Sequence, residues 1–201
     1  MPVPITISAA VEGDVDEVVA RRLIREVGAA PGTVYGKHGK PALRARINGY
    51  NNAARHTPWL VLVDLDRDAD CAPPLRQDWL PNPAPRLCFR IAVRQIEAWL
   101  MADAQALADH LRVTHRAIPA APEDLDNPKS VMVNLARRSR RRDIRTDMVP
   151  REGSGRAVGP AYTSHLIEYA EKHWRPEVAA HRSDSLRRAI ACLTRLVQER
   201  A

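Results

Sequence analysis

A continuous apolar run from Trp59 to Val63 most constrains what this chain can fold into, because it ends abruptly in alternating aspartates. A strand that is apolar at every position is typical of a parallel sheet covered by helices on both faces. Two further strands are expected at Ile5 to Val11 and Leu87 to Val93, and a short strand is expected at Thr33 to Tyr35. Because helical patterns separate these runs, the sequence predicts an α/β fold with an open, mainly parallel four-stranded sheet flanked by helices.

Helical periodicity continues beyond the expected strands, and no convincing strand follows Leu111. Five prolines between Cys71 and Arg86 indicate a loop. We therefore expect a core over residues 1–111 and a helical extension over 112–201, packed on the core as one globular unit. The expected helices are Val15 to Val27, one starting near Pro41, Glu97 to Leu111, Lys129 to Arg142, Tyr162 to Trp174 and Asp184 to Glu199.

The composition of the 201 residues argues against a membrane or secreted protein. No apolar run approaches the roughly 18 residues that a membrane span needs. Glu12 and Asp14 precede any long apolar stretch, which is unlike a secretory signal. The three cysteines lie at wide spacings that support neither a disulfide framework nor a zinc knuckle. We expect a cytoplasmic protein, and its oligomeric state stays open.

Acidic residues follow two of the expected strands. Glu12 comes after the first strand, and Asp64 and Asp66 come after the central one. Ligands of an open parallel sheet bind beyond the carboxyl ends of its strands, so these carboxylates can converge on one crevice. Crowded carboxylates repel one another unless a cation neutralises them, and hard oxygen ligands suit Mg²⁺ or Mn²⁺. The set predicts a metal site, although each acid alone could simply cap a helix or solvate a loop.

Three other sites with alternating aspartates fit less well. In a calcium-binding EF-hand that starts at Asp64, the sixth position would be Ala69 and the twelfth Leu75, where glycine and glutamate are needed. A haloacid-dehalogenase-like loop would continue with a small residue and threonine, whereas this chain has Arg67 and Asp68. A sugar-nucleotide transferase could use two aspartates on a metal, but the short chain leaves little room for its two subsites.

Two motifs carry a resemblance to a known family. Val11-Glu12-Gly13, with Asp16 three residues on, and the strand that ends Asp64-Leu65-Asp66 resemble the TOPRIM domain of topoisomerases, primases and overcoming-lysogenization-defect nucleases. The segment from Gln95 to Asp103 is similar to a small stand-alone TOPRIM-related family of unknown function. The resemblance implies that Glu12, Asp64 and Asp66 bind the metal and act in catalysis. It also implies that Asp16 and Glu97 are possible ligands of a second ion.

This resemblance implies a Mg²⁺- or Mn²⁺-dependent phosphodiesterase or nuclease acting on nucleic acid, in bacterial defence or DNA processing. Two ions about 4 Å apart would stabilise the attacking and leaving oxygens. The chain has no phosphate-binding G-x-x-x-x-G-K-[ST] motif, so any ATP-driven control would need a separate ATPase subunit. The alternative is a non-catalytic subunit that binds nucleic acid or an ATPase partner and retains a relic metal site.

A net charge of +7 favours a polyanionic partner, although 27 arginines against 4 lysines also fit a GC-rich genome. Arg137, Arg141 and Arg145 are spaced four residues apart, so a continuous helix would present them on one face that suits a phosphate backbone. Lys129 stands at a helix start and is a further candidate. The alternative for the arginines is a solvated helix end. The seven histidines show no metal-ligand spacing, and we interpret them as surface or incidental residues.

Overall fold

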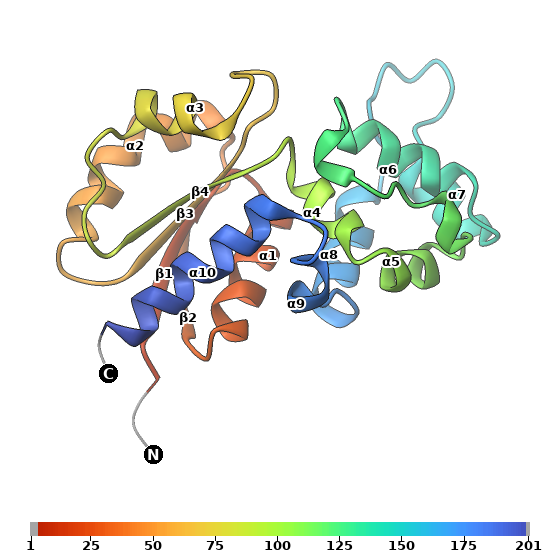
Figure 1. The fold of residues 1–201 in the computed structure, drawn as a ribbon. Helices are drawn as coiled ribbons and strands as arrows, with labels where there is room; N and C mark the ends of the chain where they lie inside the picture. The colour runs from red at the N-terminus through yellow and green to blue at the C-terminus, as the bar shows by residue number, and fades with distance from the viewer. Residues whose placement is uncertain (1–3, 200–201) are drawn as a thin grey trace.

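The computed structural model describes residues 4–199 and contains a four-stranded sheet with helices on both faces (Figure 1). All three strand pairings are parallel, and the order across the sheet is β2-β1-β3-β4. The predicted α/β fold with an open, mainly parallel sheet and a helical C-terminal part is therefore confirmed. The strands are β1 (Thr6–Val11), β2 (Ala30–Gly36), β3 (Trp59–Asp64) and β4 (Leu87–Ala92).

Helices join these strands and then make up the rest of the described chain. No helix among residues 4–199 is both long enough and apolar enough to cross a membrane. The helices are α1 (Asp14–Glu26), α2 (Lys40–Ala53), α3 (Ala72–Trp79), α4 (Ile96–Ala102), α5 (Ala104–Leu111), α6 (Pro128–Arg137), α7 (Arg142–Met148), α8 (Tyr162–Lys172), α9 (Pro176–Ala179) and α10 (Asp184–Gln198), with short 3-10 turns at His115–Ala117 and Pro122–Asp124.

The central strand β3 contributes to two hydrophobic cores, one on each face of the sheet. Leu60 and Leu62 pack in a core that also contains α1 and the C-terminal helices. Val61 and Val63 belong to a second core that α2 and α3 cover. Because successive side chains of a strand point to opposite faces, this double coverage explains why the run is apolar at every position.

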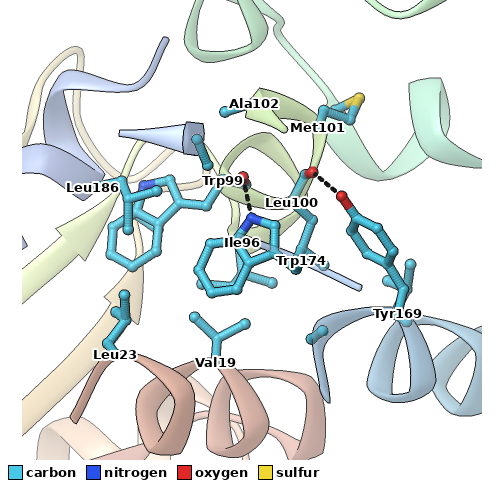
Figure 2. Close-up of a cluster of buried hydrophobic side chains, with 14 of the residues drawn as sticks. Val19, Leu23, Ile96, Trp99, Leu100, Met101, Ala102, Tyr169, Trp174 and Leu186 are labelled. Atoms are coloured by element: carbon cyan, nitrogen blue, oxygen red, sulfur yellow. Dashed lines mark hydrogen bonds between the residues drawn. The ribbon is translucent and has the colours of Figure 1, made fainter. Parts of the chain in front are cut away.

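The C-terminal helices share the first of these cores with the sheet (Figure 2). Trp99 of α4 and Trp174 are both fully buried, and the indole Nε1 of Trp174 donates to the Trp99 carbonyl at 3.2 Å. The hydroxyl of Tyr169 in α8 donates to the Leu100 carbonyl at 3.2 Å. Both tryptophans thus anchor the core, and they fix α4 against α1 and α8.

Three predicted elements differ from the structure. The predicted loop from Cys71 to Arg86 contains α3, which begins with prolines in its first turn, where proline is tolerated, and buries Leu75 and Trp79. The predicted helix from Glu97 to Leu111 is two helices, because Asp103 ends α4 and caps α5 by accepting from the Ala106 amide. The predicted helix over residues 129–142 ends at Arg137, and α7 starts only at Arg142.

Candidate functional site

The carboxyl ends of β1 and β3 meet at one edge of the sheet and bring their acidic residues together. β1 and β3 are adjacent and parallel, so the residues that follow them emerge at the same edge. Glu12 Oε1 accepts a hydrogen bond of 2.8 Å from the Asp64 backbone amide. This bond ties the residue after β1 to the last residue of β3, as the sequence predicts.

Two helix N-termini bring Asp16 and Glu97 to the same edge. Asp16 lies in the first turn of α1, and Glu97 lies in the first turn of α4. Asp64 Oδ1 accepts from the Ile96 amide at 2.8 Å, which holds the start of α4 against the end of β3. Helix N-termini favour negative charge, so both positions suit a carboxylate. We call Glu12, Asp16, Asp64, Asp66 and Glu97 the acidic centre.

The carboxylates of the acidic centre lie close enough to repel one another. Burial, and then the charges of Glu12 and Glu97, raise the pKa of Asp16 to about 7. Burial and the charges of Asp16 and Glu97 hold the pKa of Asp64 well above its usual value. Burial also raises the pKa of Glu12, although the Asp64 amide opposes the shift. The protein groups these carboxyls here instead of dispersing them, and raised carboxyl pKa values are typical of sites that bind or transform a ligand.

Two carboxylate oxygens of the acidic centre are buried without a hydrogen-bond partner. They are Asp16 Oδ1 and Glu97 Oε2, on side chains whose residues are only 7% and 3% exposed. Glu97 Oε1, in contrast, accepts from the Tyr162 hydroxyl at 3.1 Å. A buried polar atom without a partner is costly, so these two oxygens mark places where a ligand would be stabilising.

Asp66 differs from the other acids because the protein's own groups neutralise it. Gly39 N donates to the Glu12 carbonyl at 3.0 Å, which brings Lys40 to the site. The Lys40 ammonium lies 2.6 Å from Asp66 Oδ2 and 2.9 Å from Asp68 Oδ2. Although burial acts in the opposite direction, hydrogen bonds from Lys40 and Gln95 lower the pKa of Asp66.

The loop after β3 holds Asp66 in an unusual backbone conformation. Its φ of 50° lies in the left-handed region, which aspartate tolerates better than most residues. The Asp66 amide donates to the Arg94 carbonyl at 2.8 Å, and the Arg94 guanidinium donates to the carbonyls of Asp66 and Ala69. Arg94 therefore holds the loop backbone at Asp66, while Lys40 and Gln95 hold its carboxylate.

Lys129 joins the acidic centre, where the sequence had suggested only a nucleic-acid contact. Its ammonium is 3.6 Å from Glu97 Oε1, and its backbone amide donates to Gln95 Oε1 at 3.1 Å. Gln95 Nε2 donates in turn to Asp66 Oδ1 at 2.9 Å, so this amide links α6 to the loop after β3. The roles of Lys40, Arg94, Gln95 and Tyr162 were missed, because nothing in their spacing marks them and only the fold brings them together.

The donor set fits Mg²⁺ or Mn²⁺ in its chemistry. Carboxylate oxygens are the hard ligands that these ions prefer, and Asp16 Oδ1 and Glu97 Oε2 have no hydrogen-bond partner. Within residues 4–199, however, no three His, Cys, Asp or Glu side chains already surround one ion position. Glu12 and Asp64 each use one oxygen on a backbone amide, and Asp66 uses both on Lys40 and Gln95. Binding an ion would thus require side chains to turn.

The predicted arginine face does not form. Arg137 is the last residue of α6, Arg141 precedes α7 and Arg145 lies within it, so the three residues do not share one helix. Arg137 bonds Asn134, Arg141 pairs with Asp143, and Arg145 donates to the Ser139 carbonyl. The helix breaks because the backbone between residues 138 and 141 turns, with Arg140 N bonded to the Arg112 carbonyl.

The chain was compared with models of protein families, with curated proteins and with solved structures. No comparison gives a match.

Proposed function

We propose that the protein is a divalent-metal-dependent phosphodiesterase that acts on nucleic acid. The observation that carries this proposal is the burial of the Asp16 and Glu97 carboxylates, each with an unpartnered oxygen, beside Glu12 and Asp64. Burying these carboxylates together costs free energy in the empty protein, and a bound divalent cation offsets that cost. The resemblance of Glu12, Asp64 and Asp66 to the TOPRIM metal-binding motifs supports the same assignment.

Glu12, Asp16, Asp64 and Glu97 would hold Mg²⁺ or Mn²⁺, and Asp66 would join them if Lys40 moved away. The bound ion would lower the pKa of an attacking water and offset charge on the phosphodiester. The side chain of Lys129 is 42% exposed, so its ammonium can contact a phosphate oxygen while it stays near Glu97. The Tyr162 hydroxyl donates to Glu97 and orients that carboxylate. The net charge of +7 favours a polyanionic substrate.

The TOPRIM resemblance extends the proposal to a role in bacterial defence or DNA processing with a separate ATPase subunit. One observation favours the alternative of a non-catalytic nucleic-acid-binding or ATPase-partner subunit. The Lys40 ammonium lies on Asp66, where a cation would otherwise bind, and could replace the metal permanently. An activity assay distinguishes the two functions.

The test is cleavage of plasmid, single-stranded DNA and RNA with Mg²⁺ or Mn²⁺, compared between the natural protein and Asp64→Ala. We expect metal-dependent cleavage that falls by a factor of about 10³ or more in the variant, because Asp64 would hold the metal and its carboxylate accepts from the first turn of α4. Asp70→Asn is the matched control, since Asp70 is exposed in the same loop. Its activity should be unchanged.

Nucleic-acid binding without cleavage in either metal would reject the enzyme and support the non-catalytic subunit. Equal cleavage by Asp64→Ala would reject the acidic centre as the catalytic site. Circular dichroism of the Asp64→Ala variant shows whether loss of activity reflects loss of fold.

A further inference from the structure

A second polar site lies in the helical half of the molecule, away from the acidic centre. It is a pocket of about 570 Å³ between α1, α5, α8 and the start of α7. Five cationic side chains line it against one carboxylate, that of Asp109, which also accepts from Gln105 at 3.0 Å. The cations are Arg22, Arg112, Arg141, Lys172 and Arg175. We call this site the basic pocket.

Two buried nitrogens at the basic pocket have no hydrogen-bond partner. Arg22 Nε and His110 Nε2 are both inaccessible to water and unpaired, and both side chains line the pocket. His110, which the sequence marks as surface or incidental, is half-buried here. Because an arginine N–H can only donate, the Arg22 nitrogen needs an acceptor such as a phosphate oxygen.

The cations of the basic pocket are unequally engaged. Arg175 forms an ion pair with the buried Asp103 carboxylate, which neutralises part of the Arg175 charge. Lys172 and Arg141 pair with Glu168 and Asp143, but these pairs are at the surface, where an ion pair is weak. Among residues 4–199, no carboxylate forms an ion pair with Arg112 or Arg22. The pocket therefore keeps positive charge for a ligand.

The electrostatics around His110 agree with this surplus. Burial, together with His173, His165 and Arg141, lowers the pKa of His110 to about 4, while Glu168 opposes the shift. His110 is neutral at neutral pH, so it can donate or accept one hydrogen bond without repelling the cations.

We infer that the basic pocket binds a phosphate group, supplied either by a free nucleotide or by a nucleic-acid backbone. Arginine and lysine together favour a phosphate, since the guanidinium presents paired donors and the ammonium a point charge. None of the pocket-lining residues belongs to the acidic centre. Arg22 lies six residues after Asp16 on α1, or about 9 Å along the helix and on a different face of it, so the two sites are separate.

The test uses the full chain in EDTA, so that metal binding at the acidic centre does not contribute. Histidine ring resonances are followed by NMR during titration with inorganic pyrophosphate and, separately, with a short single-stranded oligonucleotide. We expect the resonances of His110 and His173 to shift, and the affinity of the double variant Arg112→Gln/Lys172→Gln to fall about tenfold. Both replaced side chains are at the surface, so the fold should be retained.

Arg46→Gln is the matched control, because Arg46 is exposed on α2 and does not line the basic pocket. Saturable shifts with pyrophosphate that weaken only in the double variant support a free phosphate ligand. The same pattern at lower concentrations of oligonucleotide supports a nucleic-acid backbone. Absence of His110 and His173 shifts with both probes, or equal affinity in the double variant, would overturn the inference.

Discussion

The acidic centre and the junction between α4 and α5 each bury an aspartate, and they neutralise its charge in opposite ways. Asp103 is fully buried and accepts from the backbone N, Nε and Nη2 of Arg175 at 3.1, 2.9 and 2.8 Å. It also accepts from the Ala106 amide as the cap of α5. Asp16 is almost as buried, yet its Oδ1 has no partner and its neighbours are carboxylates.

This difference separates a structural carboxylate from a functional one. A buried charge that is fully hydrogen-bonded holds its surroundings in place, and removing it leaves its donors unsatisfied. A buried charge without partners costs free energy in the empty protein, and the cost is recovered only when a cation binds. Stability measurements on the two sites should therefore change in opposite directions.

The largest effect is expected at Asp103. Replacing it with alanine removes the cap of α5 and leaves the Ala106 and Arg175 amides without an acceptor. Arg175 is partly exposed, so its guanidinium can return to water. We expect Asp103→Ala to lower the free energy of unfolding by about 3 kcal/mol, measured by urea denaturation.

Asp109→Ala is the matched control for this prediction. Asp109 is exposed on the same helix, α5, and accepts only from Gln105. Its replacement should change the free energy of unfolding by less than about 0.5 kcal/mol. A similarly small loss in Asp103→Ala would show that its hydrogen bonds do not hold the junction between α4 and α5.

Asp16→Asn should raise the free energy of unfolding, whereas Asp103→Ala lowers it. The folded-state pKa of Asp16, about 7, exceeds its unfolded value, so the stability it contributes is fully present below pH 3.8 and is lost as pH rises to about 7. Asparagine removes the charge. In EDTA at about pH 8, we expect the variant to unfold with a free energy about 1–3 kcal/mol greater than that of the natural protein.

The extra free energy of unfolding of Asp16→Asn should become smaller as pH falls towards 5, where Asp16 is protonated in the folded protein. Adding Mg²⁺ should raise the melting temperature of the natural protein more than that of the variant. Asp14→Asn, two residues earlier in the same helical turn, replaces an exposed carboxylate and should give no gain. Destabilisation by Asp16→Asn at about pH 8 in EDTA would mean that the acidic centre is not strained.

The sheet could be predicted because its signal is local. Apolar runs such as Trp59–Val63 are visible in the sequence, and the parallel topology follows from alternation with helices. The helical half was predicted less accurately, since helix ends depend on single side chains. Asp103 interrupts a segment with helical periodicity because its carboxylate accepts a hydrogen bond from Arg175, which lies 72 residues away in the sequence.

The acidic centre was predictable only in part. Glu12, Asp64 and Asp66 follow strands, so the topology of a parallel sheet places them at one edge. Lys40 and Tyr162 stand at helix starts that the sequence predicts, but only the tertiary fold brings these starts to the same edge. The basic pocket was missed altogether, because Arg22, Arg112 and Arg175 have no common spacing and are united by tertiary packing.

The smallest expected effect is the pH dependence of the basic pocket, which should oppose that of the acidic centre. Burial and neighbouring cations lower the folded-state pKa of His110 to about 4. Between this pKa and the unfolded value of about 6.5, the unfolded chain is protonated at His110 and the folded protein is not. The free energy of unfolding therefore decreases as pH falls from about 6.5 to about 4. His110→Gln should remove this loss, which amounts to about 1 kcal/mol or less because the ring is partly exposed.

Urea denaturation between about pH 6.5 and pH 4 measures this loss of stability, with His38→Gln as the exposed control. A His110 ring that titrates near 6.5 by NMR, or a variant as acid-sensitive as the natural protein, would remove the evidence for positive potential in the pocket.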